Sequence, residues 1–292
     1  MTGGNNQAEF EPQIVTLNRQ GAFTHEFGPA FANRKVRLAI ELLQAESEFR
    51  GSRKHVLDFL GSPDWPQRLQ EIIGIDEIQL AEAPCPKPGG HHSVAEADLD
   101  DYIHQFCAAK WPGVNQLNHG KWWAPNGGTR PQMDLICQIR VGGKDGLLFV
   151  EAKAHEGELD WGGKSLADDA SAGSVQNHEN IRQQIEFAKK GLNELPISGF
   201  NLTITSHYQL VNRLTYLWKL ASVGVPVVLM YLGFTSDKYF ATDFIQDDRH
   251  WQRIMGGYLQ GVVPHGFPES EFPLKNGASL RMIIRSCDIS PS

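Results

Sequence analysis

The stretch from Pro131 to Lys153 constrains the fold more than any other part of the chain. It consists of two apolar segments separated by a short glycine-rich turn. Apolar runs of this length around a glycine-containing turn are typical of a β-hairpin. We expect the turn to be centred on Gly143 and Lys144, which would pair Val141 with Gly146.

The same hairpin gathers charged side chains at one end. Side chains alternate along a strand, so Glu151 and Lys153 should project from the same face. With the turn placed as above, Asp134 lies opposite Lys153 on the neighbouring strand. The sequence therefore predicts two carboxylates and one ammonium group at one end of the hairpin.

The overall composition is that of an ordinary globular protein. The chain has 292 residues, of which 41% are hydrophobic and 21% charged, which suits one large domain or two smaller ones. The formal net charge of −7 excludes a uniformly basic surface. A local basic strip in an acidic chain still allows nucleic-acid binding.

The compartment is predicted from cysteine usage and from the apolar segments. The cysteines form no CxxC pair, so we expect reduced thiols in a cytoplasmic protein. The polar N-terminus lacks the layout of a signal peptide, and no apolar run approaches the roughly 20 residues of a membrane helix. The four cysteines are Cys85, Cys107, Cys137 and Cys287.

The segment from Pro84 to His92 is the best linker candidate, because its three prolines and two glycines continue neither a helix nor a strand. We therefore place a domain boundary near residue 88. Residues 1–88 are predicted to form a mainly helical N-terminal region of no assigned role, with a loose first dozen residues and helices at 30–60 and 65–73. Residues 89–292 form the second domain.

The second domain alternates helices and strands. The apolar run from Val225 to Leu232 predicts a strand buried on both faces. Together the segments predict an α/β fold with a mixed sheet flanked by helices. In chain order we expect a helix at 93–110, the hairpin at 133–153, a polar loop at 155–174, a helix at 176–195, a short strand at 201–206, a helix at 208–221, and strands at 225–232 and 280–284.

The charged cluster fits the chemistry of phosphodiester hydrolysis. Mg²⁺ prefers oxygen ligands and usually takes only one or two protein carboxylates, which Asp134 and Glu151 supply. A bound Mg²⁺, or Mn²⁺ in its place, lowers the pKa of a water and neutralises phosphate charge. Lys153 is placed to orient that water or to stabilise developing negative charge.

At these residues the chain resembles the PD-(D/E)xK nuclease superfamily, whose members have the restriction-endonuclease-like fold. Pro-Gln-Met-Asp134 corresponds to the PD part, with the proline displaced, and Glu151-Ala152-Lys153 to the ExK part. The resemblance implies that Asp134 and Glu151 are metal ligands and Lys153 is the catalytic lysine. The backbone carbonyl of Ala152 would add a ligand. The resemblance covers roughly residues 93–232.

Two further site residues follow from the resemblance alone. The helix before the hairpin often carries an acid that faces the site, and Glu96 is the first candidate, with Asp100 second. The helix after the ExK strand often carries a glutamine. Gln184 lies beside the apolar face of that helix and Gln183 points away, so Gln184 is the candidate.

Several of these residues have plainer interpretations. Glu96 lies three residues after Ser93, which is also the spacing of a capping box. Trp122 and Trp123 pack into the core or stack on bases. Arg213 either reaches a phosphate or lies on a solvated helix face. Glu151 and Lys153 themselves would, in the simplest alternative, form a solvated charge pair with Asp134.

Three functions therefore compete. The first is a Mg²⁺-dependent nuclease acting on nucleic acid, with DNA expected rather than RNA, and with a homodimer as one arrangement that would cut both strands of a duplex. The second is a non-catalytic nucleic-acid- or protein-binding module on the same fold. The third is a metal-dependent hydrolase of small phosphoesters, which would not bind polymers.

Overall fold

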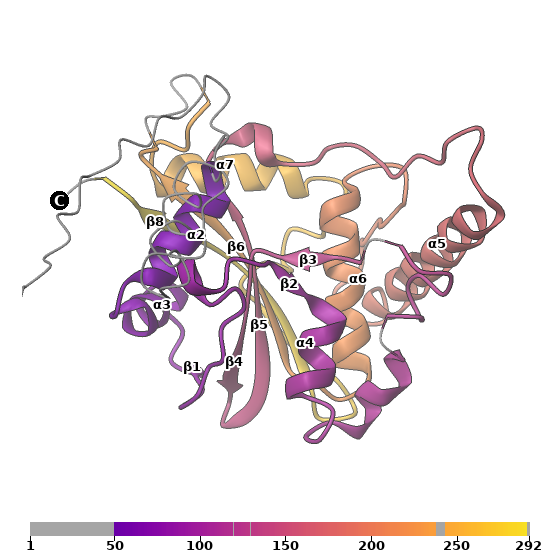
Figure 1. Cartoon of the computed structure of the whole chain (residues 1–292), viewed down its shortest axis with the longest axis horizontal. Coiled ribbons are helices and arrows are strands. Elements are labelled where there is room, and N and C mark those ends of the chain that lie inside the picture. The colour runs from indigo at the N-terminus through magenta and orange to yellow at the C-terminus, as the bar shows by residue number, and fades with distance from the viewer. Residues whose placement is uncertain (1–49, 119, 129, 238–242, 291–292) are drawn as a thin grey trace, which may run out of the picture. The chain divides into compact units, whose positions relative to one another are not determined.

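A curled, mixed six-stranded sheet forms the centre of the fold (Figure 1), in the order β1-β4-β5-β6-β8-β7. The three strands β5, β6 and β8 run parallel to one another, and the remaining neighbours are antiparallel. The strands are β1 (Ile78–Leu80), β4 (Leu135–Val141), β5 (Lys144–Lys153), β6 (Val227–Thr235), β7 (Glu271–Pro273) and β8 (Ser279–Asp288). A separate pair joins β2 (Ala97–Asp98) to β3 (Gln132–Met133).

The computed structural model describes residues 50–118, 120–128, 130–237 and 243–290. The predicted loose first dozen residues, and residues 30–49 of the predicted helix at 30–60, lie outside this part of the chain. None of the described helices has the length and apolar character that crossing a membrane requires.

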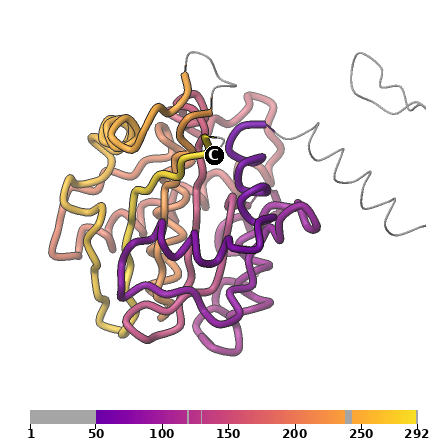
Figure 2. The backbone as a smooth tube through the Cα atoms, turned by 90° about the vertical axis from the view of Figure 1, so that its left-hand side faces the viewer, coloured from indigo at the N-terminus to yellow at the C-terminus, as the bar shows by residue number. Residues whose placement is uncertain are grey.

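Helices cover both faces of the sheet and enclose two apolar cores. On one face lie α2 (Gly51–Gly61) and α3 (Trp65–Ile73), which Figure 2 turns toward the viewer. On the other face lie α4 (Leu99–Phe106), α6 (Tyr208–Ser222) and α7 (Asp248–Leu259), with α5 (Ala172–Leu192) outside α6 (Figure 1). The predicted α/β class, with a mixed sheet flanked by helices, is confirmed.

The hairpin is present, but its register differs from the predicted one. Val141 pairs with Lys144, and the turn consists of Gly142 and Gly143 alone. Both glycines have positive φ, 55° and 79°, as a two-residue turn of the type that matches strand twist requires. The predicted turn would have placed Lys144 in that conformation, which costs an L side chain free energy. The shift is two residues, so every side chain keeps its face.

Some predicted elements are confirmed and others are wrong. The helix at 65–73 and the buried strand after residue 225 are present, and all nine residues of β6 are buried. The predicted helix at 93–110 is reduced to α4, because Ala97 and Asp98 pair with β3 and Asp98 caps the helix. Residues 201–206 form a turn and not a strand.

The segment before residue 88 contributes to the sheet of the segment after it. Strand β1 pairs with β4, with Ile78 opposite Val141, and α2 and α3 pack in the same apolar core as β4 and β5. The domain division near residue 88 stays a prediction.

Candidate active site

The three residues of the predicted cluster meet in one cavity of about 460 Å³. Asp134 occupies the bend between β3 and β4, and Glu151 and Lys153 lie at the end of β5. The observed register continues one step beyond Leu135–Val150 to place Asp134 opposite Glu151, not opposite Lys153. The sheet thus brings together two carboxylates and one ammonium group from adjacent strands.

Glu151 is held by two cations. Lys153 Nζ donates to Glu151 Oε1 at 2.6 Å, and Arg213 Nε donates to Glu151 Oε2 at 2.9 Å. All three side chains are buried, with Glu151 only 1% exposed. A buried carboxylate needs such partners, because leaving it unpaired away from water costs several kcal/mol, on the order of 3–5.

Arg213 is a member of the site, although the sequence left open whether it reaches a phosphate or lies on a solvated helix face. Its Nη2 also donates to the carbonyl of Gln132 at 2.6 Å, and its Nη1 donates to Asn212 Oδ1 at 2.6 Å. The predicted solvated helix face is wrong here, because α6 lies between the sheet and α5 and is buried almost all round. The one available signal was its position on a helix between the apolar residues Val211 and Leu214.

The electrostatics of the two carboxylates differ. Burial, with the nearby charge of Glu151, raises the pKa of Asp134 to about 7. Burial alone would also raise the pKa of Glu151, but Arg213 and Lys153 outweigh it and lower that pKa. Burial by itself would lower the pKa of Lys153, but the charges of Glu151 and Asp134 outweigh it and raise that pKa. Lys153 is therefore an ammonium ion, and with a pKa of about 7 Asp134 is only partly ionised near neutral pH.

Ala152 lies between the two charged residues of β5. Its N–H donates to Asp134 Oδ2 at 2.8 Å. The N–H and C=O of one strand residue face the same neighbouring strand, so its carbonyl faces the side on which Asp134 lies. The backbone of Ala152 therefore belongs to the same cluster as the two carboxylates.

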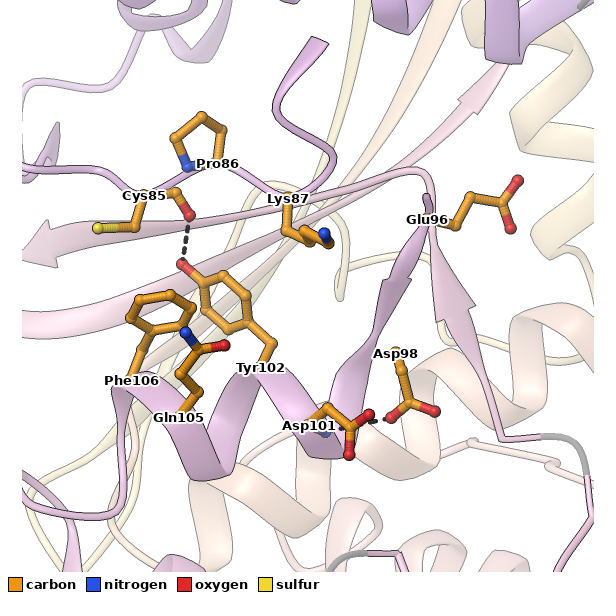
Figure 3. A pocket seen from close by; sticks show the side chains of 9 residues that line it. All are labelled: Cys85, Pro86, Lys87, Glu96, Asp98, Asp101, Tyr102, Gln105 and Phe106. Atoms are coloured by element: carbon orange, nitrogen blue, oxygen red, sulfur yellow. Dashed lines mark hydrogen bonds between the residues drawn. The ribbon is translucent and has the colours of Figure 1, made fainter. Parts of the chain in front are cut away.

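Glu96 also lines the cavity, although not from a helix. It precedes β2 and forms an ion pair with Arg53, at 3.4 Å between Oε1 and Nη1. The capping box with Ser93 is wrong, because the α4 N-cap is Asp98. Glu96 lines a second cavity of about 450 Å³ as well, where Asp98 and Asp101 add further carboxylates below the segment of Cys85 and Lys87 (Figure 3).

The remaining candidates lie elsewhere. Gln184, in the middle of α5, is half-buried and does not line the cavity. Gln209 of α6 does line it, and its Oε1 is buried without a hydrogen-bond partner among the described residues.

Asp100, the second acidic candidate, is fully buried and accepts a hydrogen bond from Tyr216 Oη at 3.2 Å. Burial, with the charge of Asp98, raises its pKa to about 6.

The tryptophan pair belongs to the core. Trp123 is fully buried and Trp122 packs against the same cluster. Their ring centroids lie 5.2 and 4.7 Å from that of Tyr216. The packing interpretation is therefore confirmed for both residues.

Among the described residues, no three or more His, Cys, Asp or Glu side chains are arranged to hold a metal ion. The predicted ligands include only two such side chains, Asp134 and Glu151, together with the backbone carbonyl of Ala152. Comparison with known proteins finds no matching family model, no matching curated protein and no matching solved structure.

Proposed function

We propose that this chain is a Mg²⁺-dependent nuclease of the PD-(D/E)xK type, hydrolysing phosphodiester bonds of nucleic acid, with DNA the expected substrate. The order of elements supports the restriction-endonuclease-like fold. Helix α4 is followed by the β4–β5 hairpin, then by α5 and α6, and then by β6 parallel to β5. Apart from the second helix, α6, before β6, this is the helix, hairpin, helix, strand order that the sequence resemblance implies.

The observation that carries the proposal is the meeting of Asp134, Glu151 and Lys153 in one cavity. The pKa of Asp134 is raised chiefly by burial and also by the charge of Glu151, so both disfavour the ionised form of this carboxyl. A divalent cation beside the pair would offset both effects. Asp134, Glu151 and the Ala152 carbonyl are hard oxygen donors, the kind that Mg²⁺ and Mn²⁺ take.

Each side chain at the site has a role that follows from its charge or from its hydrogen-bonding groups. When bound, the metal supplies a water of lowered pKa and neutralises phosphate charge. Lys153 is fully protonated, so it acts as a charge stabiliser near the scissile phosphate and not as a base. Arg213 fixes the orientation of Glu151 from α6. The amide oxygen of Gln209, which has no hydrogen-bond partner among the described residues, would hold a water or a substrate hydroxyl.

The proposal is tested by cleavage of single-stranded, double-stranded and circular DNA, and of RNA, in Mg²⁺ or Mn²⁺. We expect Lys153→Ala to abolish cleavage, and Lys190→Ala, an exposed lysine in the last turn of α5, to leave it unchanged. EDTA should abolish cleavage by the wild type. Folded, metal-loaded protein that leaves every polymer intact would contradict the proposal.

A second function is favoured by one observation. Both oxygens of Glu151 are already paired, with Lys153 and Arg213, so the cluster is nearly charge-balanced without a metal. A non-catalytic nucleic-acid- or protein-binding module would need nothing more. Calorimetry separates the two functions: a nuclease should bind Mg²⁺ or Mn²⁺ and lose that binding in Asp134→Asn, whereas a binding module should take up neither ion.

A further inference from the structure

An exposed tryptophan lies beside the candidate active site. Trp161 follows the polar segment after β5, and 48% of its surface is exposed. Asp160 before it and Lys164 after it both line the cavity of Asp134 and Glu151. The indole therefore presents a large aromatic surface to solvent next to a charged cavity.

The indole ring is fixed by two aromatic neighbours. Its centroid lies 5.2 Å from that of Tyr258, with the rings at 83°, and 5.2 Å from that of His207, with the rings at 59°. The Tyr258 ring meets the indole edge to face, a favourable arrangement of aromatic pairs, and the His207 ring is tilted against it. Tyr258 also donates from its hydroxyl to the carbonyl of Asp160 at 3.0 Å.

The backbone around Trp161 is fixed as well. The N–H of His207 donates to the Trp161 carbonyl at 3.2 Å, and the N–H of Tyr208 donates to the Gly162 carbonyl at 2.8 Å. Gly163 packs so closely that an added Cβ would lie 2.3 Å from the Thr205 carbonyl. The segment has no regular secondary structure, yet its exposed ring is pre-organised.

Besides Lys153 and Arg213, two further cations line the cavity, Arg130 and Lys164. Arg130 Nη1 lies 3.7 and 3.5 Å from the carboxylates of Asp98 and Asp101, which with Glu96 line the neighbouring cavity (Figure 3). Lys164 lies 5.2 Å above the Tyr208 ring and also lines a further cavity of about 320 Å³. Lys164 follows Trp161 by three residues, so a phosphate next to a base stacked on Trp161 has a cation close by.

We propose that Trp161 stacks on the base of an unpaired nucleotide next to the scissile phosphate, so that the substrate is single-stranded or locally unpaired nucleic acid. This inference rests on the proposed nuclease function and specifies its substrate class. In a duplex the face of a base is covered by its neighbours in the stack, and reaching it costs unstacking free energy. A base in an unpaired strand offers that face directly.

The test is a binding measurement in EDTA, so that no cleavage occurs. The probes are a single-stranded oligonucleotide carrying one 2-aminopurine, its duplex, and an abasic strand of the same length. We expect Trp161→Ala to weaken single-strand binding about fivefold or more, the effect of losing one stacked base. Phe187→Ala, which removes another exposed aromatic ring (59% exposed) from α5, should leave binding unchanged.

Two readouts do not depend on the stability of Trp161→Ala. Quenching of 2-aminopurine by the wild type, retained in Trp161→Tyr and lost in Trp161→Leu, supports stacking directly. The wild type should also bind the abasic strand about fivefold or more weakly than the normal strand.

The outcomes separate this inference from the proposed function. If Lys153-dependent cleavage occurs but the wild type and Trp161→Ala bind all three probes equally, stacking is overturned and the nuclease proposal stands. If quenching depends on Trp161 while no polymer is cleaved, stacking is supported and the nuclease proposal fails. Tighter binding of the duplex than of the single strand overturns the inference.

Discussion

Arg213 Nε lies 2.9 Å from Glu151 Oε2, and both side chains are buried between α6 and the sheet. The pair ties the helix layer to the strand that carries two of the three cluster residues. It also allows a carboxylate to sit inside a strand whose other side chains are largely apolar.

Replacing Arg213 by methionine should strongly destabilise the protein. Glu151 would keep only Lys153 as a partner, and an uncompensated buried charge costs about 3–5 kcal/mol. The free energy of unfolding in urea measures the loss. The matched control is Arg182→Met on α5, whose pair with Glu179 is exposed and should leave the urea midpoint unchanged. Equal effects of the two substitutions would contradict the buried pair.

Asp134→Asn should become more stable relative to the wild type as pH rises. The pKa of Asp134 in the folded protein, about 7, is above its ordinary value of 3.8. The wild type therefore has its full contribution from this group only below about pH 4, and loses it as pH rises through 7. The difference in unfolding free energy should grow by at most about 1.4 kcal/mol per pH unit. Urea denaturation in EDTA measures it, and a constant difference from pH 5 to 8 would show that the site does not raise the pKa.

Gln209 and Gln184 should differ in their effect on cleavage. Gln209 lines the cavity with a buried, unpaired oxygen, whereas Gln184 lies outside it. We expect Gln209→Ala to lower kcat about tenfold, the equivalent of one lost hydrogen bond. Gln184→Ala should leave kcat unchanged. If Gln184→Ala lowered kcat and Gln209→Ala did not, Gln184 would be the glutamine that acts at the site, as the sequence resemblance implies.

Gly163→Ala should destabilise the segment that carries Trp161. The new Cβ would meet the Thr205 carbonyl, and overpacking of this kind costs about 1–3 kcal/mol. Gly256→Ala is the control, because that position lies within α7 with open space around it. Alanine there should stabilise the protein by about 0.5–1 kcal/mol. Thermal denaturation of both variants tests the expected opposite signs.

Local patterns in the sequence predict much of the sheet. The hairpin, the buried strand β6 and helix α3 follow from apolar runs and glycines, and Glu151 and Lys153 share a face by alternation alone. The register was wrong by two residues because the choice between two turns depends on positive φ at Gly142 and Gly143. Alternation is insensitive to such a shift, so the cluster formed nonetheless.

Contacts between distant segments account for what the sequence did not reveal. Asp98 competes with Ser93 for the start of α4, and the outcome depends on pairing of β2 with β3, more than 30 residues away. Arg213 has the appearance of a surface residue until α5 and the sheet cover α6 from both sides. Likewise, only the folded chain shows that Gln209, and not Gln184, reaches the cavity.

The outermost strands of the sheet bear on how copies of this chain would associate. Each is only three residues long, and β7 ends in Pro273, which offers no backbone N–H. Short edges of this kind give an incoming strand little to pair with. Pairing of two copies of this chain through β1 or β7, and edge-to-edge growth of the sheet into fibres through these strands, are therefore disfavoured.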